Sequence, residues 1–418
     1  MTKKLLIVEE ALRDLKAHWF EYIKTIDKGA ENLGWHVDVA CHKDAAPEIL
    51  TAFSALPVFE HSRYLDSKKK KLPGEKHYGF ILHSIRIRKT LQSLFHNTSY
   101  SEVFVPTVLI HHLLAWYYIL KFTKKGPAHV TLFFVTNPGV WDANRKRAFF
   151  PKSTIILKYL LRLFKSLVKS NIVTLAVETQ GAKSEFEKLS GLPFKLLPHP
   201  VPFEQNVQER SALVNGSRNS KNIHFACYGF ARHEKGSDLL KAAIEQILKD
   251  DPGFEGHFSI QWTDPFKMPD GTNCAPGEIL TRSPKVNIIN RALMSNEYNR
   301  LLEQTDCMIL PYRNSSYHAR VSRVAIEAAA NGIPIIYTKD GWLEETVVNY
   351  GAGIGVADEE IDGIVAAIYQ MQESLERFKI LAQNVTPKAR AYYSPRHFVE
   401  LLFNTQQIPS YIRQDITT

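Results

Sequence analysis

Short apolar runs, each followed by a polar turn and a longer amphipathic segment, recur along the 418 residues of the chain. The first run, residues 3–8, precedes a helical pattern over 17–33 and an alternating segment over 36–41. The same order begins again with the apolar run 223–228 and a helical segment that starts at Ser237. A strand, a crossover helix and a second strand are the unit of a parallel sheet covered by helices. The pattern therefore predicts an α/β protein with two doubly wound, Rossmann-like domains.

A change in composition marks the boundary between these domains. The proline-rich segment 198–202 is followed by a polar stretch, 203–220, that is rich in Ser and Asn and is typical of a linker. We therefore expect an N-terminal domain over residues 1–203 and a C-terminal domain over 204–393.

Residues 153–169 have the clearest amphipathic pattern and predict one helix. Lys158, Arg162, Lys165 and Lys169 follow one another at spacings of four, three and four, so they form one basic stripe. Two interpretations remain open. The helix is either a core helix with a solvated basic edge or a helix that lies on an anionic membrane surface.

The net charge of +9 is unevenly distributed. Residues 1–200 hold 30 Lys/Arg against 17 Asp/Glu, whereas residues 201–418 hold 22 against 26. A basic first half favours a polyanionic partner, and charge alone fits either nucleic acid or an anionic membrane. No helix-turn-helix, zinc or RNA-binding aromatic motif accompanies the charge, so we expect no nucleic-acid partner. The four cysteines are scattered, and the N-terminus lacks the pattern of a signal peptide. We therefore expect a cytoplasmic protein, and the basic first half allows it to sit peripherally on the inner face of a membrane.

The segment 308–346 carries the most informative local chemistry. An apolar strand ends at Pro311, and an alanine-rich helix follows, with Ser322 as its expected N-cap and Asn331 with Gly332 as its stop. The free N–H groups of such a helix start bind anions.

Charged side chains surround this helix start. Arg320 and Arg323 suit a phosphate or diphosphate, and Glu327, among alanines one turn further on, suits a ribose diol. The alternative is a solvent-facing glutamate with a surface pair of arginines.

A second motif begins at Gly229, directly after the apolar run 223–228. It is Gly-Phe-Ala-Arg-His-Glu-Lys-Gly and contains Arg232 and Lys235. The glycine allows close approach of the backbone, and two cations neutralise the charge of a departing phosphate.

These two motifs, in this order and at this spacing, resemble those of retaining GT-B glycosyltransferases of family 4. The resemblance implies two Rossmann-like domains with an interdomain cleft, and a C-terminal tail, 394–418, that packs back on the first domain. It also implies transfer of a sugar from a nucleotide-diphosphate donor, which acts as a co-substrate, to a hydroxyl acceptor. The implied donor-binding residues are Gly229, Arg232, Lys235, Arg291, Leu293, Tyr317, Arg320, Ser322, Arg323, Val324 and Glu327. Many family members carry an earlier glutamate where this chain has Ala319.

The first domain resembles the family in layout more than in residues. The family often has a histidine near the transferred sugar, after the strand that corresponds to residues 131–135; here the position is Asn137, which by resemblance is catalytic together with Arg232 and Lys235. On the acceptor side we place His18, His111 and His199, although His18 also fits an ordinary helix start, and His111 with its neighbour fits simple packing.

The sequence thus predicts a retaining glycosyltransferase that uses no metal, because no Asp-x-Asp motif occurs. Two alternatives remain. One is a sugar-nucleotide epimerase or hydrolase on the same fold, and the other is a non-catalytic subunit that docks on a membrane or a partner enzyme. Ala319 and Asn137 favour the non-catalytic alternative, whereas the presence of Arg232, Lys235 and Glu327 opposes it.

Overall fold

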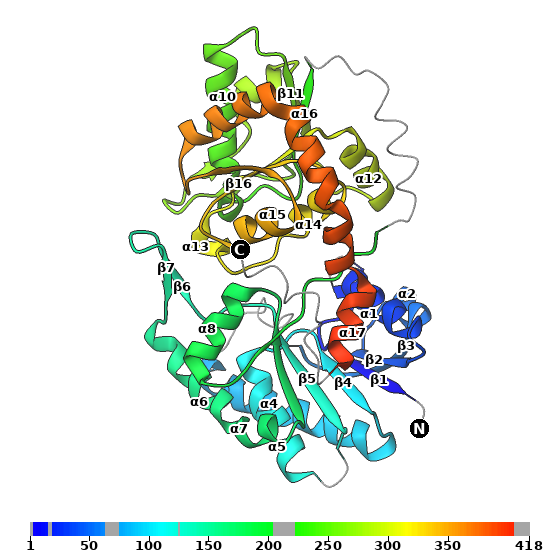
Figure 1. The fold of residues 1–418 in the computed structure, drawn as a ribbon. Coiled ribbons are helices and arrows are strands. Elements are labelled where there is room, and N and C mark those ends of the chain that lie inside the picture. The colour runs from blue at the N-terminus through cyan, green and yellow to red at the C-terminus, as the bar shows by residue number, and fades with distance from the viewer. Residues whose placement is uncertain (1–2, 16–18, 63–74, 124–125, 204–221, 405–418) are drawn as a thin grey trace, which may run out of the picture. The chain divides into compact units, whose positions relative to one another are not determined.

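The computed structural model describes residues 3–15, 19–62, 75–123, 126–203 and 222–404 (Figure 1). His18, most of the predicted linker and the end of the predicted tail lie outside the described residues. The chain divides into two compact units. Unit 1 comprises Met1–Pro138, Phe150–Pro200 and Ser394–Thr418, and unit 2 comprises Gly139–Phe149 and Val201–Tyr393.

Unit 1 is built on a seven-stranded sheet in the order β3-β2-β1-β4-β5-β8-β9, in which every pair of neighbouring strands is parallel. Its strands are β1 (Lys4–Val8), β2 (His36–His42), β3 (Ser54–Phe59), β4 (Glu102–Val105), β5 (His129–Phe134), β8 (Val173–Val177) and β9 (Lys195–Leu196). Its helices are α1 (Trp19–Glu31), α2 (Pro47–Ala52), α4 (Glu75–Asn97), α5 (Ile110–Phe122), η1 (Lys152–Thr154), α6 (Ile155–Leu163), α7 (Lys165–Lys169), α8 (Gln180–Ser190) and α17 (Pro395–Phe403).

Unit 2 is built on a parallel six-stranded sheet in the order β14-β11-β10-β15-β16-β17. Its sheet strands are β10 (Ile223–Cys227), β11 (Gly256–Gln261), β14 (Val286–Ile289), β15 (Cys307–Leu310), β16 (Ile335–Thr338) and β17 (Gly353–Val356), and a short pair is formed by β12 (Phe266–Lys267) and β13 (Asn273–Cys274). Its helices are η2 (His233–Lys235), α10 (Ser237–Asp250), α11 (Gly277–Arg282), α12 (Ser295–Gln304), α13 (Asn314–Tyr317), α14 (Arg323–Ala330), α15 (Trp342–Tyr350) and α16 (Ile361–Tyr392).

The central strands are buried on both faces, as expected for parallel strands between layers of helices. Every residue of β5, β15 and β16 is buried. The predicted α/β class with two doubly wound domains is therefore confirmed.

Local sequence signals set both ends of α14. The Ser322 hydroxyl accepts a hydrogen bond from the Ala325 N–H at 3.3 Å, which makes Ser322 the N-cap of α14. After α14 the chain turns at Gly332, whose φ of +66° lies in the left-handed region that glycine adopts without strain. Both predicted ends of this helix are confirmed.

Two predicted helices differ from the structure. The single helix predicted over 153–169 is divided into η1, α6 and α7, because at Phe164 the N–H bonds to the Leu161 carbonyl, three residues back rather than four. In unit 2, the two helices predicted over 357–372 and 375–381 form the one long helix α16, which is kinked at Ser374.

The C-terminal helix α17 is part of the core of unit 1. Phe398 is fully buried, and its ring centroid lies 5.7 Å from that of Phe104 and 6.3 Å from that of Phe133. Helix α1 approaches closely at Gly29, where a Cβ would lie 3.1 Å from Val399. Residues before and after unit 2 in the sequence therefore share one core.

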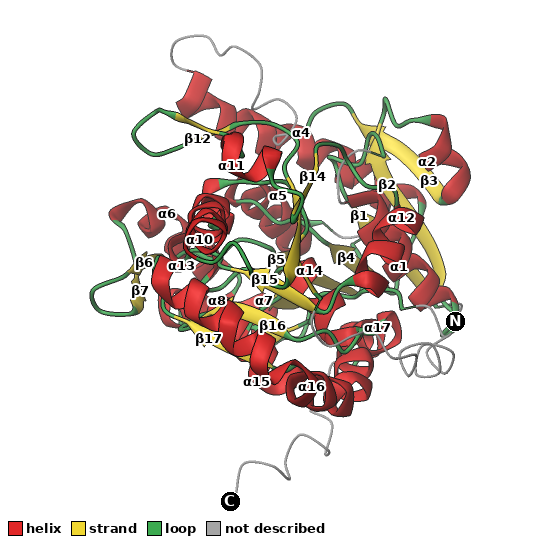
Figure 2. Ribbon diagram, turned by 90° about the horizontal axis from the view of Figure 1, so that it is seen from above, coloured by secondary structure: helices red, strands yellow, loops and turns green. Residues whose placement is uncertain are grey.

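A hairpin formed by β6 (Val140–Asp142) and β7 (Arg147–Phe149) departs from the predicted domain boundary. The prediction included it in the first domain, but it belongs to unit 2. It packs beside α13, as both views show (Figures 1 and 2).

Candidate active site

The loop after β10 brings Gly229 and Lys235 into contact. Gly229 has a φ of +88°, and a Cβ at this position would lie 2.4 Å from the Nζ atom of Lys235. A larger residue than glycine would therefore displace the ammonium group. The same Nζ atom lies 5.6 Å from the centroid of the Tyr312 ring, which offers the cation an aromatic face.

The Lys235 ammonium is withdrawn from water without an ion pair to hold it, although the nearby charge of Glu234 partly offsets the cost. Burial lowers its pKa below the ordinary lysine value, and the nearby charge of Arg232 lowers it further. No carboxylate in the described part of the chain forms an ion pair with it. Arg232 itself is exposed, and its guanidinium lies 3.4 Å from the Glu234 carboxylate. A half-buried ammonium without an ion-pair partner favours the binding of an anionic ligand.

Arg313 fixes the loop that carries these cations. Its side chain is buried and donates two hydrogen bonds to the Asp238 carboxylate, at 2.8 and 2.6 Å. It also donates to the Glu359 carboxylate at 2.7 Å and to the carbonyl oxygen of His233. The backbone N–H of Arg313 donates to the Glu234 carbonyl at 3.1 Å. The segment after β15 therefore holds the Gly229–Lys235 loop in place.

Helix α14 presents its N-terminus beside the same loop, since the Val324 side chain lies 4.0 Å from the position of a Gly229 Cβ. The N–H groups of the first helical turn have no partner within the helix. Arg320 is exposed, and its guanidinium lies 5.1 Å from the centroid of the Tyr317 ring. These groups form a positively polarised surface of the kind that binds phosphates.

Glu327 is buried one turn into α14 and already has two partners. Its Oε1 accepts a hydrogen bond from the Arg323 side chain at 2.8 Å, and its Oε2 accepts one from the Tyr298 hydroxyl at 2.7 Å. The alternative of a solvent-facing glutamate is therefore wrong, because Glu327 is 8% exposed. Each carboxylate oxygen keeps a second lone pair that can accept a ligand hydroxyl.

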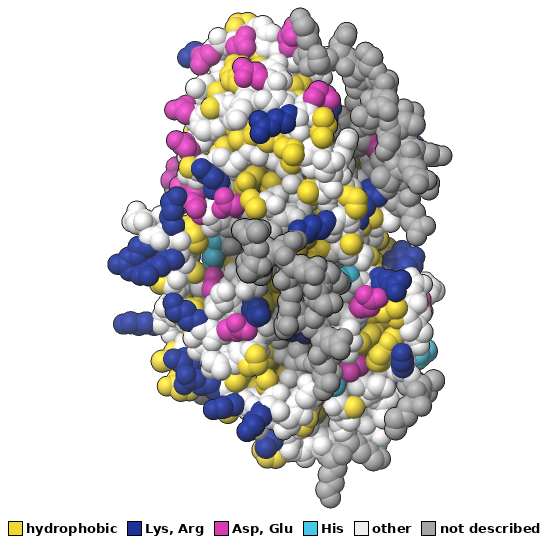
Figure 3. Space-filling model, viewed as in Figure 1, with side chains coloured by type: hydrophobic (Ala, Val, Ile, Leu, Met, Phe, Trp, Pro, Cys, Tyr) yellow, Lys and Arg dark blue, Asp and Glu magenta, His cyan; other side chains and the backbone are white. Residues whose placement is uncertain are grey.

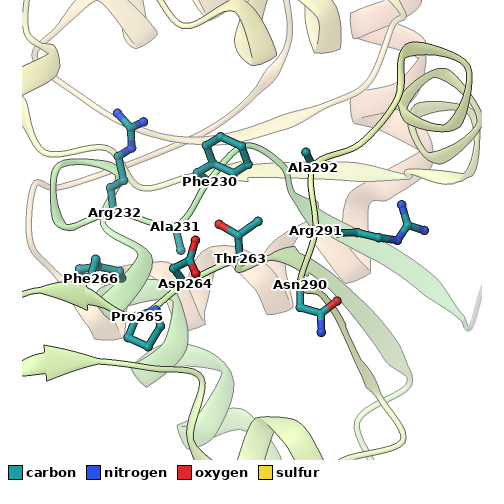
Figure 4. A pocket seen from close by; sticks show the side chains of 10 residues that line it. All are labelled: Phe230, Ala231, Arg232, Thr263, Asp264, Pro265, Phe266, Asn290, Arg291 and Ala292. Carbon is teal, nitrogen blue, oxygen red and sulfur yellow. The ribbon is translucent and has the colours of Figure 1, made fainter. Parts of the chain in front are cut away.

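A hollow of about 570 Å³ lies at the carboxyl ends of β10, β11 and β14 (Figure 4). Phe230 and Arg232 line it from the first loop, Asp264 and Phe266 from the second, and Arg291 from the third. In Figure 4 the side chain of Arg232 extends upward and that of Arg291 extends to the right.

Gln261 ties the loops of this hollow together. Its Oε1 accepts the Gly229 N–H at 2.7 Å, and its Nε2 donates to the Arg291 carbonyl at 3.0 Å. The Arg291 side chain is held by Glu297, and Leu293 is half-buried against the core of unit 2. The predicted donor residues therefore lie in the segments that follow β10, β14 and β15, including the short helices η2 and α13, and in the first two turns of α14.

The predicted catalytic residue Asn137 and the predicted acceptor-side residues His111 and His199 lie on different segments of unit 1. Asn137, after β5, donates to the Glu185 carboxylate at 3.0 Å. His199 lies 2.8 Å from the Glu178 carboxylate. His111 packs on Phe80 with ring centroids 5.6 Å apart. The structure does not bring these three side chains into mutual contact.

Two glutamates directly after β1 form the most perturbed acidic pair of unit 1. Burial raises the pKa of Glu9 to about 7. Burial would also raise the pKa of Glu10, but the charges and hydrogen bonds of His112 and His83 hold it below the ordinary value. The Glu10 carboxylate lies 3.1 Å from His83 Nε2 and 3.3 Å from His112 Nε2.

Two imidazoles and one carboxylate are also a donor set that binds zinc, and their ligand atoms lie within 4.8 Å of one another. The Leu109 N–H donates to His112 Nδ1 at 3.2 Å, which puts a proton on Nε2, facing Glu10. A neutral imidazole with its proton on Nε2 favours a hydrogen bond to the Glu10 carboxylate over metal ligation. That the reaction uses no metal stays a prediction.

Sequence reasoning missed several residues of these sites, namely Glu9, Glu10, His83, Gln261, Tyr298 and Arg313. The adjacent glutamates after the first strand were a usable signal, because carboxyl ends of parallel strands bind ligands. The others act through contacts between residues far apart in the chain, which no local pattern reveals.

Comparison with known proteins supports the interpretation of both motifs in unit 2, the Gly229–Gly236 loop and the segment 308–346. Residues 222–374 match the family model described as Glycosyl transferases group 1. The glycogen synthase of Mycobacterium tuberculosis is 35% identical over 68 residues, which is 16% of this chain and 16% of that protein. The match thus spans about a sixth of the length of these curated relatives.

Solved structures match over nearly the whole chain. The sucrose-phosphate synthase of Thermosynechococcus elongatus has a TM-score of 0.62 at 16% identity, covering 95% of this chain and 96% of that one. HepE of Anabaena, in complex with UDP and glucose, has a TM-score of 0.61 at 13% identity, with 95% and 97% covered. These matches confirm the predicted GT-B fold.

Replacing Arg313 with Met tests whether the buried Arg313 contacts hold the Gly229–Lys235 loop in place. The Asp238 carboxylate, 15% exposed, would lose its partner, and we expect the free energy of unfolding to fall by about 3–5 kcal/mol. Glu359→Gln is the matched control, because Glu359 is 60% exposed and its ion pair should contribute at most about 1 kcal/mol. Urea unfolding of both variants measures the difference. Equal losses of unfolding free energy in the two variants would contradict the role of Arg313 in holding the loop.

Proposed function

We propose that this chain, a member of the group 1 glycosyl transferases, transfers a sugar from a nucleoside diphosphate to an acceptor hydroxyl. The observation that carries the proposal is the half-buried Lys235 ammonium beside Gly229, which forms no ion pair within the described residues and lies next to the N-terminus of α14. A diphosphate supplies the negative charge that this arrangement lacks.

The donor would lie along the carboxyl edge of the unit 2 sheet. The diphosphate faces Arg232, Lys235 and the first N–H groups of α14, while the ribose hydroxyls bond to Glu327. The base occupies the hollow lined by Phe230 and the loop at Arg291. The complex of HepE with UDP and glucose supports a uridine nucleotide as the first donor to test.

The chemical step would be the departure of the nucleoside diphosphate from the anomeric carbon. The cations at Arg232 and Lys235 stabilise the negative charge that develops on the leaving phosphate. A phosphate oxygen of the donor then accepts the proton of the attacking hydroxyl, and the new bond forms on the face that the phosphate leaves. This course, taken from the resemblance to family 4, retains the configuration.

The acceptor would bind to unit 1. Asn137, Glu9 and Glu10 follow β5 and β1, so they lie at the carboxyl edge of that sheet, where ligands of such domains bind. Hydroxyl groups of an acceptor suit carboxylate and amide partners.

Lys235→Ala tests the proposed role in the leaving-group step. We expect turnover to fall about 100- to 1000-fold, the usual effect of removing one preorganised stabilising group. The measurement is nucleotide release from a UDP-sugar with and without candidate acceptors. Lys249→Ala, an exposed lysine at the end of α10, is the matched control and should leave turnover unchanged.

Normal turnover of the Lys235 variant would contradict the proposal. Wild-type release of nucleotide that no acceptor accelerates would favour the hydrolase or epimerase alternative. A folded wild-type protein that binds donor nucleotides but turns none over would favour the non-catalytic alternative.

We also propose that unit 1 binds an anionic membrane surface, where a lipid-linked acceptor would be presented. Helix α5 packs against both α4 and α6, and each of the three helices carries exposed apolar side chains. These are Ile81, Leu82, Ile85, Tyr118, Phe122, Ile155, Ile156, Tyr159 and Leu163. A contiguous apolar patch at a protein surface marks an interaction site, and we take these side chains on neighbouring helices to form one.

Cations border this apolar surface. Arg162, Lys165 and Lys169 are exposed, and Lys158 is half-buried. Figure 3 shows Lys and Arg side chains beside apolar ones along the edge of unit 1 where Figure 1 places α6 and α7. In the described part of the chain, no helix combines the length and the apolar character needed to cross a bilayer. Bulky apolar groups flanked by cations suit binding in the interface plane.

Ile156→Glu tests the membrane proposal, with Ile380→Glu as the matched control. The two isoleucines are 58% and 57% exposed, and Ile380 lies on α16 of unit 2. We expect wild type and the Ile380 variant to co-sediment at low salt with vesicles containing phosphatidylglycerol, and the Ile156 variant to bind at least fivefold more weakly. Wild-type protein that stays in the supernatant at low salt, or equal effects of both substitutions, would contradict the proposal.

A further inference from the structure

The β6–β7 hairpin packs on the segment that leads into the donor site. The Trp141 ring stacks on the His318 ring, with centroids 5.2 Å apart and an interplanar angle of 28°. His318 lies between Tyr317 and Arg320 in the sequence, four residues before the N-cap of α14. It is 9% exposed, so the contact with the hairpin is part of a buried surface.

The two faces of the hairpin have different surroundings. Val140 and Phe149 pair across the strands and are 44% and 49% exposed. Trp141, the next residue, points to the opposite face, because side chains alternate along a strand. The hairpin therefore directs one aromatic side chain at His318 and leaves its other face uncovered.

A second contact lies beside the first. Lys146, at the end of the turn, places its Nζ 2.8 Å from the Asp340 carboxylate. Asp340 belongs to the loop before α15, and the N–H of Trp342, the first residue of that helix, donates to the His318 carbonyl at 3.0 Å. The hairpin thus contacts two segments that are hydrogen-bonded to each other.

The His318 segment is also fixed from its other side. His318 Nδ1 lies 2.9 Å from the Asn314 carbonyl oxygen, and the Asn314 side chain donates to the Lys339 carbonyl. Movement of His318 would therefore shift the backbone that carries Arg320 and Ser322.

We propose that Trp141 is a positioning residue for the donor site: it holds residues 317–322 so that Arg320 and the N-terminus of α14 face the donor diphosphate. The proposal rests on the proposed function and adds a residue from outside the matched region 222–374. Both flanks of the hairpin belong to unit 1, since the chain leaves that unit after Pro138 and returns at Phe150. The hairpin that contacts the donor segment, Gly139–Phe149, therefore begins two residues after Asn137 in the chain.

The test compares Trp141→Ala, Trp141→Phe and the control Arg145→Ala. Arg145 lies in the turn of the same hairpin, and its side chain is 69% exposed. UDP affinity is measured by calorimetry, with GDP and ADP in parallel, together with donor KM, kcat and the unfolding midpoint. We expect Trp141→Ala to weaken nucleotide binding and raise donor KM by about three- to tenfold, the range of one aromatic pair.

The controls separate positioning from a general loss of stability. Trp141→Phe, which keeps an aromatic ring on His318, should restore affinity to within about twofold of wild type, and Arg145→Ala should leave it unchanged. A role in stability alone would lower the unfolding midpoint of Trp141→Ala without changing nucleotide affinity or donor KM, and would overturn the proposal. An equal loss of affinity in Arg145→Ala would also overturn it.

A surface variant keeps the test decisive if Trp141→Ala does not fold. Lys146→Met removes the ammonium group that pairs with Asp340, and the Lys146 side chain is 67% exposed. We expect nucleotide binding to weaken up to about fivefold at low salt, and less at high salt because salt screens the pair. Unchanged affinity at low salt would then overturn the proposal. A folded wild-type protein that binds none of the three nucleotides would instead overturn the proposed function, and this inference with it.

Discussion

A cation withdrawn from water is unfavourable unless a negative charge lies beside it. The arrangement of unit 2 around Lys235 follows from this constraint. The ammonium group lies against Gly229 and the Tyr312 ring, and burial lowers its pKa. Within the described residues it has no carboxylate partner, so the free protein holds it at a cost that a bound anion removes. The positively polarised start of α14 beside it points to a ligand with more than one negative charge.

The surrounding structure maintains this unfavourable arrangement. Gly236 packs so tightly that a Cβ there would lie 2.0 Å from the Pro311 carbonyl oxygen, and Arg313 joins the same loop to Asp238. Gln261 connects Gly229 with the neighbouring loop at Arg291. Strain and unpaired charge persist at a functional site only when the surroundings over-determine the conformation, and here three separate contacts do so.

The sequence allowed prediction of what depends on neighbours in the chain. The Ser322 cap, the turn at Gly332 and the glycine–lysine loop are local patterns, and each lies where it was predicted. The Trp141–His318 stack and the Glu10–His83 pair join residues from distant segments, so no local pattern could indicate them. The break at Phe164 was missed because amphipathic spacing continues through it, although the tighter turn there ends α6.

The most direct test of the central claim is the pKa of the Lys235 ammonium, followed by NMR of carbon-13-labelled lysine, with Lys235→Arg to assign the signal. In the free protein the pKa should lie below the ordinary lysine value, because burial disfavours the charged form. It should rise when UDP is added, because the diphosphate stabilises that form; by linkage, UDP affinity should fall as the pH rises through the pKa of the free protein. An ordinary pKa that neither UDP, GDP nor ADP changes would contradict the account.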